Sequence, residues 1–103
     1  MKSKYEARAK VIKAMAHPAR LMIVDELSRK KKSVRELTDL VGSDMSTVSK
    51  HLSVLKNAGI VSDERAGTTI FYHLKMPCIL GFFGCVETVL KESARETMKL
   101  IKL

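Results

Sequence analysis

The segment Asp44-Met-Ser-Thr-Val-Ser-Lys-His-Leu-Ser-Val-Leu-Lys-Asn-Ala-Gly59 decides the predicted fold of this chain. Val48, Leu52 and Leu55 recur at the spacing of helical turns, so the segment is predicted to be a helix with one apolar stripe. Asp44 is expected to cap the N-terminus, because its carboxylate accepts hydrogen bonds from free N–H groups of the first turn. Gly59 is expected to end the helix, since glycine tolerates the left-handed conformation that follows many helices.

The face of this helix away from the apolar stripe has the residue types of a nucleic-acid-binding surface. No acidic side chain lies between residues 45 and 58, which indicates a polyanionic partner. Short donors and acceptors near a helix N-terminus suit base edges and phosphates in the major groove of double-stranded DNA. The DNA-binding residues predicted on this helix are Ser46, Thr47, Ser49, Lys50 and His51. For His51, a packing role beside Leu52 stays open.

The chain is predicted to be one small basic domain over residues 1–103. Its formal net charge is +8, and residues 1–35 alone carry +8 while the other 68 residues sum to zero. A basic balance favours a nucleic acid or an anionic membrane surface as partner. The run Arg29-Lys-Lys-Lys32 either follows a phosphate backbone or forms a solvated face.

No apolar run approaches the roughly 20 residues that span a bilayer, and the N-terminus lacks the apolar core of a secretory signal. We therefore expect a cytoplasmic protein with no membrane partner. The two cysteines do not make a disulfide framework, and a reducing compartment keeps them as thiols.

The first half of the chain is predicted to be helical. A helix over about 4–15 is interrupted before Pro18, which suits the first turn of a second helix. The inward face of the second helix is predicted to be Leu21, Val24 and Leu27. Ser33-Val-Arg-Glu36 has the pattern of a capping box and opens a third helix that Gly42 ends. With the short turn and the helix that follow, this predicts a helix-turn-helix over about 33–58.

The pattern changes after Gly59 to that of a β-hairpin over about 60–75. Ile60-Val61 and Thr69–Leu74 are rich in β-branched and aromatic residues, and Ala66-Gly67 is the expected tip. These two strands form a wing beside the helix-turn-helix. Arg65 is predicted to reach a phosphate or a neighbouring minor groove, and a solvated turn is the alternative.

A long helix is predicted from Pro77 to about residue 100. It has more apolar residues than one face of a thin domain can bury: Ile79, Phe82, Phe83, Val86, Val89 and Leu90. We expect the two terminal helices, over about 4–15 and 77–100, to hide this surplus in a homodimer. The predicted fold class is therefore mostly α with a small β-wing: a winged helix-turn-helix of about five helices and a two-stranded hairpin, dimeric through its terminal helices.

The chain resembles the ArsR/SmtB family of winged-helix repressors over nearly its whole length. The residues that carry the resemblance are Ala14–Leu21, Ser46–Leu52, Leu55–Val61 and Phe71–Leu74. The resemblance implies a homodimer that binds a short operator inverted repeat in its own promoter. It also implies that transcription is blocked until an effector lowers the affinity for DNA, and that the helix residues predicted above lie where the family meets DNA.

The effector sites of several family types are missing from this sequence. Arsenite- and cadmium-type members have a Cys-x-Cys pair where this chain has Ser33-Val-Arg35. Zinc- and nickel-type members have Asp and His ligands on the C-terminal helix, which contains no histidine here. His17, His51 and His73 lie on different predicted elements, so no zinc site is expected, and His17 is best explained by capping or packing.

Cys78 and Cys85 are the remaining candidates for an effector site. Seven residues put both thiols on nearly one helix face, about 10 Å apart along the axis. An intrahelical disulfide, which needs Cα atoms within about 7 Å, is excluded. Thiolates bind arsenite and other thiophilic ions, and the position of Cys78 in the first helical turn favours its thiolate. The hypothesis is a thiol sensor for a thiophilic metalloid or metal, or for a redox or sulfur species; burial of both cysteines as small hydrophobes is the alternative.

Other classes of function are weighed against this one. The sequence has no Gly-rich phosphate loop, nucleophile elbow or apolar carboxylate pair, so we expect no enzyme and no required cofactor. One alternative is a winged-helix regulator that senses neither metal nor thiol chemistry. The other is a protein-interaction module that has lost DNA binding. The sequence leaves repression and activation undistinguished.

Overall fold

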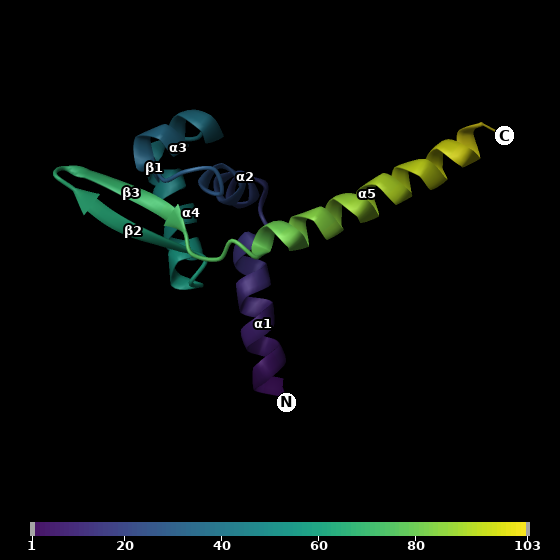
Figure 1. Cartoon of the computed structure of the whole chain (residues 1–103), viewed down its shortest axis with the longest axis horizontal. Helices are drawn as coiled ribbons and strands as arrows, with labels where there is room; N and C mark the ends of the chain where they lie inside the picture. The colour runs from purple at the N-terminus through teal and green to yellow at the C-terminus, as the bar shows by residue number, and fades with distance from the viewer. Residues whose placement is uncertain (1, 103) are drawn as a thin grey trace.

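The computed structural model describes residues 2–102, so the first and last residues of the predicted domain lie outside it. The described residues form five helices and three strands (Figure 1). In chain order they are α1 (Lys2–Met15), α2 (Pro18–Leu27), β1 (Lys32–Ser33), α3 (Val34–Val41), α4 (Met45–Asn57), β2 (Val61–Ala66), β3 (Thr69–Leu74) and α5 (Ile79–Ile101). The central elements form a body from which α1, α5 and the β2–β3 hairpin project in three directions. The predicted fold class is confirmed in its helices and its wing.

Local capping interactions fix where the central helices begin and end. The Ser33 hydroxyl accepts from the N–H of Glu36 at 3.1 Å, and the Glu36 carboxylate accepts from the N–H of Ser33 at 3.0 Å, which completes the predicted capping box. Asp44 accepts from the N–H of Thr47 at 2.7 Å and caps α4. Gly42 closes α3 in the left-handed region at φ 77°. Each of these signals lies within a few residues of its helix end, so the sequence alone suffices to predict it.

The hydrophobic core lies between α2, α3, α4 and the base of the hairpin. Its fully buried side chains include the predicted α4 stripe of Val48, Leu52 and Leu55. The prediction for α2 is wrong at one position, because Leu21 is 40% exposed while its unpredicted neighbour Ile23 is fully buried. The face of α2 that meets the core is Ile23, Val24 and Leu27, and Leu21 is turned toward α5 instead.

The β-sheet has three strands, in the order β1-β3-β2, where the sequence predicted two. The extra strand is the short segment that leads into α3: Lys32 pairs with Tyr72 and Ser33 with Phe71. The predicted hairpin tip is also shifted by one residue. Ala66 still pairs with Thr69, so the two residues of the turn are Gly67, at φ 65°, and Thr68.

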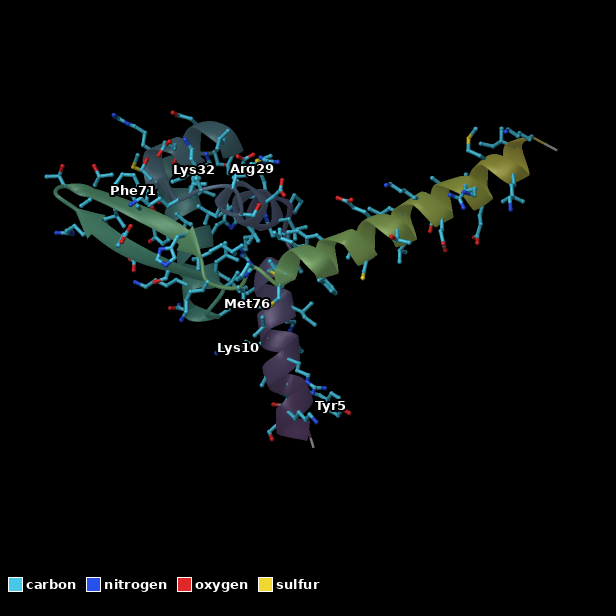
Figure 2. All side chains as sticks on the ribbon, viewed as in Figure 1. Tyr5, Lys10, Arg29, Lys32, Phe71 and Met76 are labelled. Carbon is cyan, nitrogen blue, oxygen red and sulfur yellow. The ribbon has the colours of Figure 1, made fainter. Side chains whose placement is uncertain are left out.

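The two terminal helices differ slightly from the predicted bounds. α1 begins at Lys2, and α5 begins at Ile79 because Pro77 and Cys78 form a turn ahead of it. α5 is 23 residues long, and Figure 2 shows its C-terminal half surrounded by open space on the protomer. Within residues 2–102, no helix combines the length and the apolar character that crossing a membrane requires.

Candidate nucleic-acid interface

The helix α4 presents most of its predicted DNA-binding residues to solvent. Burial of the Val48–Leu52–Leu55 stripe fixes the rotation of the helix and turns Ser46, Ser49 and Lys50 outward. Thr47 is half-buried, and its N–H is bound to the Asp44 cap. The hydrogen bonds from Thr47 hold the pKa of the Asp44 carboxyl below its usual range. The first two turns of α4 are thus an ordered surface of hydroxyls and one cation, preceded by an exposed N-cap.

A groove of about 440 Å³ runs between the start of α4 and the tip of the wing. Ser49 and Met45 of α4 line one side, and Thr68 and Thr69 of the hairpin line the other. Arg35 of α3 also lines it, is exposed and makes no ion pair within residues 2–102. Sequence reasoning missed Arg35. The feature of the sequence that could have indicated Arg35 is its position as the second residue of α3, the helix that precedes α4 in the helix-turn-helix. The fold brings this position alongside α4.

The wing is neutralised at its base and cationic toward its tip. Asp63 pairs with Lys56 at 3.1 Å, and Glu64 pairs with Lys31 at 3.0 Å. The hydrogen bond and charge of Lys31 lower the pKa of Glu64. Arg65, the next residue, is exposed and joins none of the ion pairs formed by the described residues. Its place near the tip suits the predicted contact with phosphate, which stays a prediction.

The basic run 29–32 does not present four free cations. Arg29, in the turn after α2, pairs with Asp25 and Glu26 of the last turn of that helix. Lys31 is occupied by Glu64 and lies 5.2 Å from the centre of the Phe71 ring. Lys32 is part of β1 and is half-buried. This run therefore resembles a solvated face more than a continuous phosphate-binding strip.

His51 makes contacts inside the protein. Its ring is half-buried, its Nδ1 accepts from the Nε–H of Arg20 at 3.1 Å, and its centroid lies 4.5 Å from that of His17. Burial, then the charges of His17 and Arg20, lowers the pKa of His51. His17 itself caps α2 by accepting from the N–H of Ala19 at 3.0 Å, as the capping interpretation predicted. A DNA contact by His51 stays a prediction, now beside a packing role.

Cys78 and Cys85 are both free thiols and both exposed on the protomer, so the alternative that they are buried as small hydrophobes does not hold there. Cys78 was predicted in the first turn of the helix, but it is the residue before α5 and its side chain caps nothing. It lines an apolar groove of about 430 Å³ together with Met15, Met76 and Phe82. Within residues 2–102, no three His, Cys, Asp or Glu side chains come together as metal ligands would.

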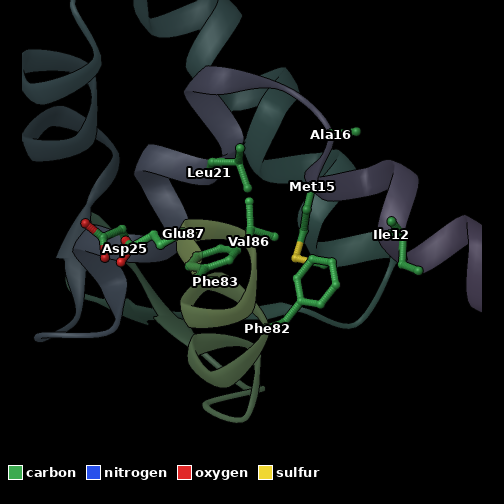
Figure 3. Close-up of a pocket in the computed structure, with 9 residues that line it drawn as sticks. All are labelled: Ile12, Met15, Ala16, Leu21, Asp25, Phe82, Phe83, Val86 and Glu87. Atoms are coloured by element: carbon green, nitrogen blue, oxygen red, sulfur yellow. The ribbon is translucent and has the colours of Figure 1, made fainter. Parts of the chain in front are cut away.

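A second apolar groove, of about 360 Å³, lies where α5 leaves the body. Figure 3 shows Phe82, Phe83 and Val86 of α5 turned toward side chains of α1 and α2 across this space. Beyond the groove, the apolar residues of α5 continue at helical spacing, and Val89 and Leu90 are each 63% exposed. An apolar stripe of this length is unusual on the surface of a monomer.

Two helices joined by the three-residue turn 42–44, followed by a β-hairpin, define a winged helix-turn-helix protein. The chain matches the family described as "Bacterial regulatory protein, arsR family" over residues 17–63. It is 36% identical, over 84% of its length and 76% of the relative's, to the HTH-type transcriptional regulator Rv0081 of Mycobacterium tuberculosis. The chain therefore belongs to the arsR family, whose members are regulators of transcription and not enzymes, as the sequence predicted.

Solved structures agree with this assignment. The crystal structure of M. tuberculosis Rv0081 has a TM-score of 0.80 and 33% identity, over 91% of this chain and 95% of that one. The homodimeric winged helix-turn-helix DNA-binding domain of Mb0332 from Mycobacterium bovis has a TM-score of 0.78 and 28% identity, over 92% and 88%. The transcriptional repressor BigR from Xylella fastidiosa has a TM-score of 0.74 and 32% identity, over 86% and 91%.

Proposed function

We propose that the chain is a cytoplasmic transcriptional repressor that binds an inverted-repeat operator in double-stranded DNA as a homodimer. One observation carries the proposal: α4 presents exposed Ser46, Ser49 and Lys50 and no acidic side chain after its cap, on a chain of net charge +8. Such a surface suits the major groove, where hydroxyls and cations meet base edges and phosphates. Arg35, which lines the groove beside α4, and the exposed Arg65 on the wing add positive charge to the proposed interface.

The homodimer is supported by the exposed apolar surface of the terminal helices. Tyr5 and Ile12 on α1 are 57% and 51% exposed, and Val89 and Leu90 on α5 are each 63% exposed. The similar Mb0332 domain is described as homodimeric. A twofold dimer places two copies of α4 side by side, as recognition of two half-sites about one helical turn of DNA apart requires.

Release from DNA is proposed to follow an effector that acts at Cys78 and Cys85. Each thiol lies four residues before an apolar residue of the α5 stripe, Phe82 and Val89 respectively, so both flank the proposed dimer surface. A change at these thiols would alter how the two protomers pack. It would thereby alter the spacing of the two α4 helices, at a coupling energy of about 1–3 kcal/mol.

The proposed effectors are a thiophilic metalloid or metal such as arsenite, or a redox or sulfur species. Thiophilic metals and metalloids are soft ions that bind thiolates, and redox or sulfur species are electrophiles that react with them. Either kind of effector can reach an exposed thiol. No resident cofactor is part of the proposal. The similar BigR is described as a transcriptional repressor, and this description supports repression as the proposed mode of regulation.

A mobility-shift experiment tests DNA binding. The probe is the DNA upstream of the protein's own coding region, and the variants are Lys50→Ala and, as matched control on the remote α5, Lys99→Ala. Wild type and the control should shift the probe equally, and Lys50→Ala should weaken binding about tenfold or more. Indifference to the duplex at low salt would instead favour a protein-interaction module.

The same assay, with a panel of arsenite, antimonite, cadmium, zinc, peroxide and persulfide, tests the effector. Cys78→Ser/Cys85→Ser should bind the probe as wild type does and should ignore the compound that releases wild type. If the double variant is released normally, the thiols are not the sensor. If no compound or thiol reagent releases wild type, the alternative is a winged-helix regulator without thiol or metal sensing.

A further inference from the structure

Arg20, His17 and His51 form a small cluster that joins three helices. His17 lies between α1 and α2, Arg20 is on the first turn of α2, and His51 is in the middle of α4, 31 residues away from Arg20. The two imidazole rings are 4.5 Å apart and inclined by 44°. The predicted contact of His51 with DNA does not involve its bond to Arg20, which lies inside the protein.

The guanidinium of Arg20 ties the end of α1 to α4. Its Nε–H donates to Nδ1 of His51 at 3.1 Å, and an Nη1–H donates to the carbonyl of Ala14 at 3.4 Å. Carbonyls in the last turn of a helix have no partner within that helix, and Ala14 is one residue from the end of α1. One planar side chain therefore spans the terminal helix and the proposed recognition helix.

Both histidines of the cluster accept hydrogen bonds through Nδ1, from Arg20 and from the N–H of Ala19. A neutral imidazole has one nitrogen free to accept, whereas an imidazolium has none. Protonation of His51 would break its bond to Arg20 and leave two cations facing each other at the same distance. The hold of Arg20 on α4 thus requires an uncharged His51.

The surroundings of His51 offer no compensating negative charge. The charged groups that act on it are His17, from the α1–α2 junction, and Arg20, from α2. α3 and β2 also pack on α4, and in the described part of the chain they contribute no carboxylate to the pKa of His51. Burial acts in the same direction, so every influence on the ring favours its neutral form.

We infer that Arg20 is a positioning residue for α4, which it holds against α1 and α2 only while His51 is uncharged, and that acidification releases this hold. The free protein should then lose stability as the pH falls through the titration of His51. The sequence selectivity of DNA binding should fall with it, and this second consequence rests on the proposed function.

Thermal unfolding of the free protein at pH 7.5 and 5.5 tests the first consequence. His51→Gln keeps a side-chain oxygen that accepts from Arg20 and removes the titration, and His73→Gln on β3 is the matched control. On acidification, the melting temperatures of wild type and of the control should fall by on the order of 5 °C more than that of His51→Gln. Equal losses in wild type and His51→Gln would overturn the inference.

Proton NMR of wild type gives a test that needs no variant. The ring signals of His51, the Nε–H of Arg20 and the amides of α4 should shift with one common midpoint. Titration of the ring without a response from Arg20 would overturn the inference even if the glutamine variant failed to fold.

The DNA arm compares affinity for a duplex that the protein selects from a random pool with affinity for a shuffled duplex of equal length. The ratio removes the general gain in attraction to phosphate at low pH. For wild type, this affinity ratio should fall about tenfold between pH 7.5 and 5.5. For His51→Gln it should stay nearly constant over the same range. For Arg20→Met it should be low at both pH values. If wild type bound neither duplex at pH 7.5, the proposed function would be refuted, and the thermal unfolding experiment alone would test the inference. A ratio in wild type that ignores pH would refute the inference.

Discussion

Replacing Leu90 by alanine tests whether α5 forms a dimer interface. Leu90 lies on the helical stripe that passes through Phe82 and Val86, and it is 63% exposed on the protomer. Because most of the side chain meets solvent, its truncation should leave the protomer folded. The substitution should instead weaken the dimer contact that covers the stripe.

The magnitude follows from the exposed fraction. The change removes three carbons, each worth about 0.8 kcal/mol when transferred from water to an apolar contact. Scaled by an exposure of 63%, the loss is about 1.5 kcal/mol per protomer for a fully covered side chain. A twofold dimer has the change twice, so the loss of about 3 kcal/mol should raise the dimer dissociation constant about 150-fold.

Sedimentation equilibrium over nanomolar to 100 micromolar concentrations measures this constant. Lys91→Ala is the matched control, because Lys91 is the exposed neighbour on the side of α5 away from the stripe. Circular dichroism should give the same helix content for both variants. If Leu90→Ala dimerises as tightly as Lys91→Ala, the interface does not include this stripe and the reasoning is refuted.

Three further predictions concern the wing, the helix caps and acid. Arg65→Ala should weaken binding to all duplexes and reduce the log–log salt slope by about 2, one unit per protomer; an unchanged slope would remove Arg65 from the interface. Ser33→Ala should cost about 1 kcal/mol and lower the melting temperature by roughly 4–8 °C relative to Ser43→Ala, since only Ser33 caps a helix. Asp44 and Glu36 have lowered pKa values in the fold, so the stability that they give is present at pH values above their ordinary pKa values. This stability is lost as the pH falls below about 5. Asp44→Asn, which still accepts a hydrogen bond, should make the melting temperature depend less on pH in this range.

The parts of the fold that could be predicted from the sequence are those that local chemistry determines. The Ser33–Glu36 box, the Asp44 cap and the α4 stripe each depend on residues within one or two helical turns. The prediction for Leu21 was wrong because spacings of three and four are both helical. Only the position of α5 shows that Leu21 faces the groove while Ile23 faces the core.

The features that were missed all depend on contacts between distant segments. β1 exists only because Lys32 and Ser33 lie beside Phe71 and Tyr72 of β3. The link from Arg20 to His51 joins residues 31 positions apart, and no periodicity reveals it. Arg35 likewise joins the α4–wing groove only after α3, α4 and the hairpin are assembled. The outward residues of α4 could be predicted from the sequence, because the buried apolar stripe determines which side of the helix faces solvent.

The most direct test of the account is the binding of the protein to its selected duplex as a function of salt, with the stoichiometry measured in the same titration. Arg35, Lys50 and Arg65 are the three cations that we place at the interface, so a dimer brings six. Two protomers should bind each duplex, with a log–log slope of about −5. A slope near zero, or one protomer per duplex, would contradict the proposed binding of DNA by a homodimer.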